Sequence, residues 1–284
     1  MIGNARELAQ TVPRDPVGAW LWAKEELDDR REHRRPPCPY RGNKDWEREL
    51  HQALGLTWPS PFAAEFNTAW AAVMDRYKAQ GIAIGRGAFA GWGDGEPGMI
   101  RAVWCLIRHL RPANVVETGV ARGFTSRMIL EALERNRKGY LWSIDLPPVQ
   151  APELHAQIGS AVDPELRHRW TYLRGTSRQR LPRLLRDLGS IDLFVHDSRH
   201  TEQNVRFELD RAWAALRPGG AVVADDIDMN WGFNSFMRTA TGHLSLICYA
   251  EPLRPDRKRF EGTGLFGIAL KQPLALAQSS AKAN

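Results

Sequence analysis

The chain has 284 residues, of which 43% are hydrophobic and 25% charged. This composition is typical of a globular protein with a core, and it excludes disordered, collagen-like and disulfide-framework classes. The net charge of +6 leaves a nucleic-acid surface to be considered. The three cysteines are odd in number and far apart, and the first residues lack the apolar run of a signal peptide. We therefore expect a cytoplasmic protein without membrane association.

Residues 1–97 are predicted to form a mainly helical N-terminal extension that contributes to a substrate site. Helical periodicity is clear from Phe62 to Lys78, after an irregular stretch rich in proline and arginine. The extension runs into a glycine-rich loop at residues 85–98, GRGAFAGWGDGEPG, which carries Trp92. Glycines permit a hinge, so this loop is interpreted either as a lid over a ligand or as a plain linker.

Residues 98–272 alternate helical and strand-like patterns and are predicted to form one domain. The strand-like runs are ANVVETG, YLWSIDLPP, WTYL, IDLFVHD and GAVVADDI, and helical patterns separate most of them. This alternation predicts an α/β fold of the Rossmann-like, doubly wound type, with a mostly parallel sheet covered on both faces. Two last runs, HLSLICYA and GLFGIAL, predict a C-terminal antiparallel hairpin. Residues 273–284 are expected to be a tail.

One helical stretch in this domain, RQRLPRLLRDL, is strongly basic. It places four leucines at helical spacing, so its arginines fall on the opposite, solvated face; the leucines are Leu181, Leu184, Leu185 and Leu188. A solvated face is the simpler explanation of such a charge run. The sequence therefore favours a small molecule over nucleic acid as the partner.

The ends of the first two strands carry the first candidate ligand-binding residues. In a parallel sheet, ligands bind at the carboxyl ends of the strands. Gly119 and Gly123 would let the backbone approach a ligand closely, and the helix that follows offers free N–H groups to an anion. Asp145 ends the second strand, where a carboxylate can accept hydrogen bonds from both hydroxyls of a ribose. Together these residues predict a site for a nucleoside-like ligand.

Glu117 indicates which nucleoside. The loop lacks the second glycine of a dinucleotide motif, and no phosphate-binding lysine follows it. A carboxylate immediately before the first glycine would repel a pyrophosphate, whereas it suits a ligand with an ammonium group. The methionyl amine of S-adenosylmethionine is such a group, so an aminoacyl nucleoside is favoured over a dinucleotide.

Four motifs together resemble a known family. VVETGVARGFTS, LWSIDLPP, IDLFVHDSRHT and LRPGGAVVADDID are similar to motifs of class I S-adenosylmethionine-dependent methyltransferases, and most similar to the macrocin-type and cephalosporin-hydroxylase-like natural-product O-methyltransferases. The resemblance spans about Met99 to Lys271, and one departure is Ala121, where many methyltransferases have glycine. The resemblance implies that the methionyl part is surrounded by five residues, that Asp145 holds the ribose, and that two residues edge the adenine pocket. The five are Glu117, Gly119, Gly123, Thr125 and Ser126, and the two are Gly175 and Ser177.

Three aspartates follow the next strands and predict a cation site. Asp197 ends one strand, and Asp225 and Asp226 end the next. Clustered carboxylates repel one another unless a cation neutralises them, and carboxylate oxygens suit Mg²⁺ or another divalent cation. In the resembled family, acids at these places bind an ion that holds the acceptor oxygen. The alternative is structural, because Asp197 or Ser198 could instead cap the next helix.

His200 is the candidate general base, and Asp197 is the second candidate catalytic residue. An imidazole titrates near neutral pH and can take the proton from an acceptor hydroxyl; the alternative is a loop histidine without a catalytic role. The predicted reaction is metal-assisted methyl transfer from S-adenosylmethionine to a small-molecule hydroxyl. Two other classes remain open, a nucleic-acid-modifying or nucleic-acid-binding protein and a metal-dependent hydrolase or hydroxylase-like protein. The latter would leave Glu117 and Asp145 without a role. A homo-oligomer is also compatible with the sequence.

Overall fold

The computed structural model describes residues 38–85, 87–89, 97–147, 152–250 and 264–272, with the single residues Trp20, Ala23, Leu27 and Pro36. The predicted tail, the first part of the N-terminal extension, and Trp92 with most of the predicted lid lie outside these residues.

The centre of the molecule is a seven-stranded sheet in the order β3-β2-β1-β4-β5-β7-β6. β1 to β5 are parallel, and β7 pairs antiparallel with both β5 and β6. The Rossmann-like prediction and its C-terminal antiparallel hairpin are confirmed. The strands are β1 (Asn114–Thr118), β2 (Tyr140–Asp145), β3 (Trp170–Arg174), β4 (Ile191–His196), β5 (Leu216–Ala224), β6 (His243–Tyr249) and β7 (Leu265–Lys271).

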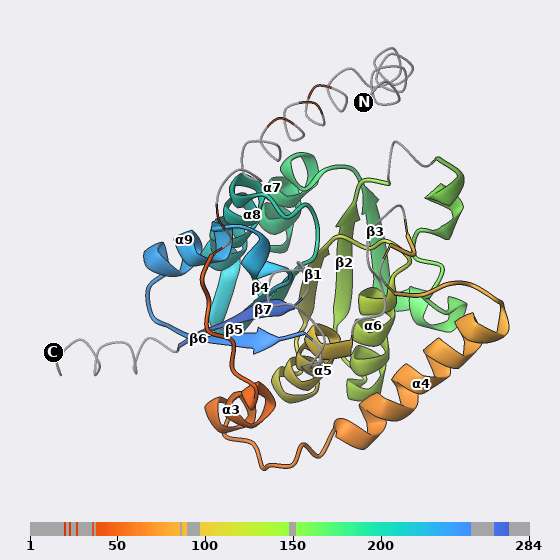
Figure 1. The fold of residues 1–284 in the computed structure, drawn as a ribbon, viewed down its shortest axis with the longest axis horizontal. Helices are drawn as coiled ribbons and strands as arrows, with labels where there is room; N and C mark the ends of the chain where they lie inside the picture. Colours follow the sequence, from red (N-terminus) through yellow and green to blue (C-terminus); the bar gives the residue numbers. More distant parts are fainter. Residues whose placement is uncertain are drawn as a thin grey trace, which may run out of the picture.

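Helices cover both faces of the sheet, which makes three layers (Figure 1). One face packs against α4 (Ala63–Ala79), α5 (Pro97–Leu110) and α6 (Phe124–Asn136), and the other against α7 (Ser177–Leu188), α8 (Glu202–Ala215) and α9 (Gly232–Thr239). Short 3₁₀ turns lie at η1 (Pro152–Gln157), η2 (Pro164–Arg169) and η3 (Ile227–Met229). No helix within the described ranges has both the length and the apolar character needed to cross a membrane.

The strands supply both hydrophobic layers because successive side chains point to opposite faces of a sheet. In β1, Val115 joins the core beneath α5 and α6, whereas Val116 joins the core beneath α7 and α8. By the same alternation, Glu117 lies on the α5–α6 face and Thr118 on the α7–α8 face. The same strand therefore sends polar side chains in both directions just before its end.

The basic helix α7 confirms the prediction of a wet and a dry face. Leu181, Leu184 and Leu185 are buried, while Arg183 and Arg186 are exposed. Thr176 begins the helix with a capping box, in which its side chain and that of Gln179 each accept from the other's backbone N–H.

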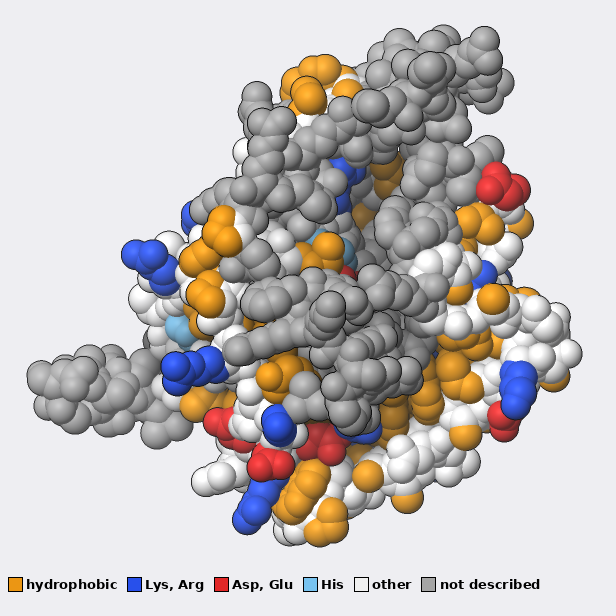
Figure 2. All heavy atoms as spheres, viewed as in Figure 1, with side chains coloured by type: hydrophobic (Ala, Val, Ile, Leu, Met, Phe, Trp, Pro, Cys, Tyr) orange, Lys and Arg blue, Asp and Glu red, His pale blue; other side chains and the backbone are white. Residues whose placement is uncertain are grey.

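The described part of the N-terminal region packs on the sheet domain. Phe66 and Val73 of α4 are buried in the same core as α5 and α6, and the Tyr77 hydroxyl lies 2.8 Å from the Ser160 hydroxyl. Hydrophobic side chains gather alongside α4 in Figure 2. The shorter α3 (Trp46–Ala53) lies near β6, where Asn43 and Cys248 form an isolated bridge. Residues far apart in sequence thus share one core.

Candidate functional site

The site lies where the order of the strands reverses, between the carboxyl ends of β1 and β4. The chain runs outward from β1 through β2 to β3 and then returns to β4 on the other side of β1. Ligands of doubly wound sheets bind at this position. The two strand ends are in close contact, because the Asp197 N–H donates to the Thr118 carbonyl at 2.8 Å. A Cβ on Gly119 would lie 1.8 Å from the Asp197 carbonyl oxygen, so only glycine fits there.

The loop from Gly119 to Gly123 turns sharply between β1 and α6. Both glycines have φ near +85°, and Gly123 immediately precedes the helix. Ala121 also adopts a left-handed conformation, with φ of 47°, although it carries a side chain. The departure noted in the sequence therefore changes the residue but keeps the turn. Asp145 stabilises this turn, since one of its oxygens accepts from the Val120 and Ala121 N–H groups at 3.1 and 3.0 Å.

Arg122, in the same loop, connects the turn from Gly119 to Gly123 with the start of the predicted lid. Its buried guanidinium donates to the carbonyls of Ala83 and Ala88 at 2.8 and 2.9 Å and lies 5.4 Å from the centre of the Phe89 ring. The segments 83–85 and 87–89 are therefore attached to the first strand end, whereas residues 90–96 lie outside the described residues.

Glu117 is fully buried beneath this loop. One carboxylate oxygen accepts from Ser126 at 2.6 Å and from Ser143 at 2.7 Å. The other, Oε1, is buried without a hydrogen-bond partner in the described part of the chain. Burial raises the pKa of Glu117 to about 7, against the lowering effect of the two serine hydroxyls. A buried acceptor without a donor is costly, so this oxygen is suited to a donor from a ligand.

The other predicted cofactor residues divide between two places. Thr125 is nearly buried in the first turn of α6. Gly175 follows β3 and donates its N–H to the Asp145 carbonyl at 2.9 Å, which places it beside the end of β2. Ser177 is buried and its hydroxyl donates to the Asn204 side chain at 3.3 Å. Its hydroxyl is therefore engaged with α8.

The predicted acidic cluster gathers at the same edge of the sheet. Burial raises the pKa of Asp197 well above its ordinary value, and the charges of Asp225, Asp226, Glu117 and Asp145 raise it further. Neither Asp197 nor Ser198 caps the next helix, because Thr201 caps α8 by accepting from the Asn204 N–H. The capping alternative is therefore wrong. However, within the described ranges no three or more His, Cys, Asp or Glu side chains are placed so that they could hold a metal ion.

His200 lies among these acids. Its Nε2 atom is 3.9 Å from an Asp197 oxygen and 3.7 Å from an Asp226 oxygen, and its Nδ1 atom is buried with no hydrogen-bond partner among the residues described. Burial and, to a smaller extent, the nearby His196 lower the pKa of His200 to about 3, against an opposing effect of the Glu208 charge. The imidazole is therefore neutral at physiological pH, and a pKa this low makes it a weak base unless a nearby negative charge raises the pKa.

A second buried acid, Glu208 of α8, was not predicted. It is fully buried and lies directly behind the acidic cluster, where it contacts Thr118, His196 and Ser198. The sequence held one signal of it. Glu208 occupies the apolar stripe of α8 formed by Val205, Leu209 and Ala212, all of them buried, and an acid in such a stripe indicates a buried polar contact.

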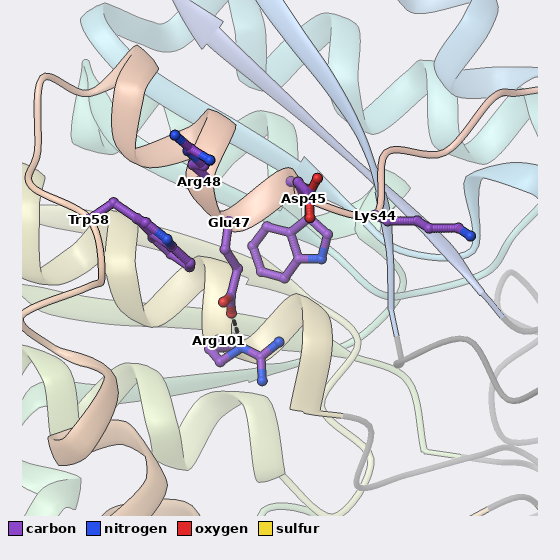
Figure 3. A pocket seen from close by; sticks show the side chains of 7 residues that line it. Lys44, Asp45, Glu47, Arg48, Trp58 and Arg101 are labelled. Atoms are coloured by element: carbon purple, nitrogen blue, oxygen red, sulfur yellow. Dashed lines mark ion pairs between the residues drawn. The ribbon is translucent and has the colours of Figure 1, made fainter.

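A separate pocket of about 300 Å³ lies between α3 and the start of α5. In Figure 3, Glu47 and Arg101 point toward one another and form an ion pair, with Trp58 beside them. None of the residues lining this pocket belongs to the cluster at the strand ends. Its central charges neutralise each other, whereas Glu117 Oε1 and His200 Nδ1 at the strand ends are buried without a hydrogen-bond partner among the described residues.

Comparisons with known proteins agree with this location. Residues 116–227 match a family described as a methyltransferase domain, a range that includes the glycine loop and the acidic cluster. A comparison with curated proteins finds no match.

Solved structures share the fold at low sequence identity. An O-methyltransferase from Bacillus cereus in complex with S-adenosylhomocysteine is 14% identical, with a TM-score of 0.52 over 81% of this chain and 98% of that chain. A candidate O-methyltransferase from Klebsiella pneumoniae is 16% identical, with a TM-score of 0.50 over 81% and 97%. The O-methyltransferase TomG from Streptomyces achromogenes, involved in tomaymycin synthesis and in complex with S-adenosylmethionine, is 16% identical, with a TM-score of 0.49 over 81% and 97%. Residues 116–227 thus resemble a methyltransferase domain, and the chain shares its Rossmann-like fold with solved O-methyltransferases.

Proposed function

We propose that this protein transfers the methyl group of S-adenosylmethionine to a hydroxyl of a small molecule. The observation that carries the proposal is Glu117, a buried acid with one unpartnered oxygen at the β1–β4 switch point. A methionyl ammonium would supply the missing donor and would favour the ionised carboxylate.

The remaining cofactor contacts follow from the same strand ends. Gly119 and Gly123 form the left-handed turn that would bring the backbone close to the methionyl chain, and the first turn of α6, with Thr125 and Ser126, presents N–H groups toward its carboxylate. Asp145 accepts from the ribose hydroxyls while it holds the loop. Gly175 edges the adenine in this arrangement, and Ser177 would do so through its backbone, because its hydroxyl donates to Asn204.

The acceptor would bind on the side of Asp197, Asp226 and His200. Methyl transfer forms a bond from the acceptor oxygen to the methyl carbon and breaks the bond from that carbon to sulfur, which leaves S-adenosylhomocysteine. The acceptor proton passes to the neutral His200, whose pKa the Asp197 and Asp226 carboxylates beside it would raise when they are ionised. In-line placement of oxygen, carbon and sulfur supplies most of the rate enhancement.

A divalent cation such as Mg²⁺ fits the donor chemistry of Asp197, Asp225 and Asp226. The fit rests on their mutual repulsion, since the pKa of Asp197 is raised by burial and by both neighbours. The side chains are not gathered into a ligand group within the described ranges, so binding would require them to move. When bound, the cation would make an acceptor hydroxyl more acidic. If turnover proves to need no cation, Asp197 and His200 would have to orient and deprotonate the acceptor by themselves.

The test uses methyl-labelled S-adenosylmethionine with a panel of phenols, alcohols, amines and a duplex nucleic acid. We expect calorimetry to show binding of S-adenosylmethionine and label to appear on hydroxylated small molecules. Excess EDTA should stop turnover and leave cofactor binding in place. Absence of cofactor binding would contradict the proposal as a whole. Label on amines or nucleic acid would contradict the acceptor class, and full turnover in EDTA would contradict the metal.

A further inference from the structure

Glu208 is held by four donors from the strand ends and its own helix. Its Oε2 atom accepts from the Thr118 hydroxyl at 2.5 Å and from His196 Nδ1 at 2.7 Å. Its Oε1 atom accepts from the Ser198 hydroxyl at 2.8 Å and from the Asn204 amide at 2.9 Å. These contacts join the ends of β1 and β4, the following loop and α8 at one fully buried carboxylate.

The carboxylate stays ionised in this setting. Burial raises the pKa of Glu208, but the His196 imidazole and the hydrogen bonds from His196, Ser177 and Thr118 together outweigh burial and lower the pKa to about 2. A charged acceptor strengthens each of the four hydrogen bonds.

The loop from Asp197 to His200 is fixed at successive residues by this network and its neighbours. The Asp197 N–H donates to the Thr118 carbonyl, and the Ser198 hydroxyl donates to Glu208. The Asn204 amide donates to the Arg199 carbonyl at 3.1 Å, and the Asn230 amide donates to the His200 carbonyl at 3.1 Å. The backbone that carries Asp197 and His200 is thus fixed by hydrogen bonds at each of the four loop residues.

The His200 ring has few restraints of its own. Neither of its nitrogens lies within hydrogen-bond distance of the nearby aspartates, and Nδ1 has no partner in the part of the chain described. Its ring meets the edge of His196 at 5.4 Å between centres and 83° between planes. The orientation of the His200 ring therefore depends on the backbone of its loop and on the His196 ring. Glu208 contacts both, through hydrogen bonds from Ser198 of the loop and from His196.

From this geometry we propose that Glu208 is a positioning residue for methyl transfer, acting through His196 and Ser198 on His200 and Asp197. The proposal rests on the function proposed above. Four donors converge on Glu208, and a glutamine there would offer one acceptor oxygen and turn an N–H₂ group toward the remaining donors. Glu208→Gln should therefore release the ring of His196 and the loop, even where the fold survives.

The direct test is imidazole NMR of ¹⁵N-histidine-labelled full-length protein at one fixed pH, with saturating S-adenosylhomocysteine. Signals are assigned with His196→Gln and His200→Gln. In Glu208→Gln we expect loss of the hydrogen-bonded His196 Nδ1 proton signal and changed ring ¹⁵N shifts for His200. Asp210→Asn removes an exposed carboxylate from the same helix and should leave both unchanged. A role in stability alone would lower Tm without moving the His200 signals of the folded protein, and unchanged His200 signals would overturn the proposal.

Turnover separates this proposal from the function it rests on. With an acceptor that the wild type methylates, Glu208→Gln should lower kcat by about 10- to 100-fold, the scale of a small misplacement of a reacting group, with little change in the KM for S-adenosylmethionine. Glu208→Asp, which keeps the charge, should recover part of kcat. A wild type that binds no S-adenosylmethionine would refute the proposed function, whereas kcat in Glu208→Gln equal to that of Asp210→Asn would refute only the role of Glu208.

Discussion

Two carboxylates on opposite faces of the same strand end are equally buried and yet differ in every other respect. Glu117, on the α5–α6 face, has two serine donors on one oxygen and none on the other in the described structure, and its pKa is raised to about 7. Glu208 reaches the α7–α8 face with all its donors in place, and its pKa is lowered to about 2. We call Glu208 the complete acid, because both of its oxygens accept hydrogen bonds, and we interpret it as a support of the site. We call Glu117 the incomplete acid, because one of its oxygens has no partner among the described residues, and we propose that a ligand supplies that donor.

The strongest way to break this comparison is to remove the complete acid. Glu208→Ala leaves the His196 imidazole and three other buried donors without their acceptor. We expect the free energy of unfolding to fall by about 3–5 kcal/mol, because each buried donor left without an acceptor costs about 1–3 kcal/mol. Urea unfolding measures the loss. Asp210→Ala, the exposed control on the same helix, should change stability by less than about 0.5 kcal/mol. Equal changes in the free energy of unfolding for the two substitutions would show that the hydrogen bonds of Glu208 do not stabilise the fold.

The incomplete acid should reveal itself through pH. Its pKa of about 7 lies above the ordinary value of 4.5, so the folded protein binds more protons than the unfolded chain between about pH 4.5 and 7. Stability contributed by the protonated form is present below pH 4.5 and is lost as the pH rises through 7, with a total of about 3 kcal/mol at most.

Glu117→Gln removes this contribution because the amide does not ionise. We expect the stability difference between the variant and the ligand-free wild type to grow in favour of the variant from pH 5 to pH 7, as measured by urea unfolding at each pH. Glu165→Gln, at an exposed glutamate, is the control. Parallel stability curves for wild type and Glu117→Gln would show that Glu117 ionises normally.

Asp145 sharpens the comparison on the ligand side. It already supports the glycine loop with one oxygen, and the prediction gives it the ribose as well. Asp145→Ala should weaken S-adenosylmethionine binding by about 1.5–3 kcal/mol, the value of hydrogen bonds to a charged group. Calorimetry on a folded variant measures this, with Asp187→Ala on the outer face of α7 as control. Unchanged affinity would remove the ribose assignment.

Surface charge should matter least. Arg183 and Asp187 form an exposed pair on α7, 3.5 Å apart, with side chains 81% and 61% exposed. Arg183→Ala should change the free energy of unfolding by less than about 1 kcal/mol, as is usual for such pairs. A larger loss would mean that the basic face of α7 is more than a solvated surface.

Much of this architecture could be predicted because it depends on patterns within short stretches of sequence. The leucine spacing of α7 and the apolar runs of the strands determine their elements, and strand ends of a parallel sheet must meet at one edge. Glu117 and Ser126 are also only nine residues apart in the sequence. These local patterns predicted both a site at the carboxyl ends of the strands and the gathering of the acids.

The network around Glu208 could not be predicted in the same way. Thr118 and Glu208 are 90 residues apart, and their contact depends on β4 lying beside β1 and on which face of the strand Thr118 occupies. The sequence shows an acid in an apolar stripe but not the donors that meet it. Likewise, the acids of the predicted metal site could be placed at one edge, whereas the positions of their oxygens depend on side-chain packing.

The central claim is that S-adenosylmethionine completes Glu117, and proton release on binding tests it most directly. At pH 6.5 Glu117 is mostly protonated in the free protein, and a bound ammonium would hold it ionised. Calorimetry in buffers of different ionisation enthalpy counts the protons released. We predict more than half a proton per S-adenosylmethionine for the wild type and far less for Glu117→Gln. Equal proton release by the two proteins, or none by the wild type, would contradict the account.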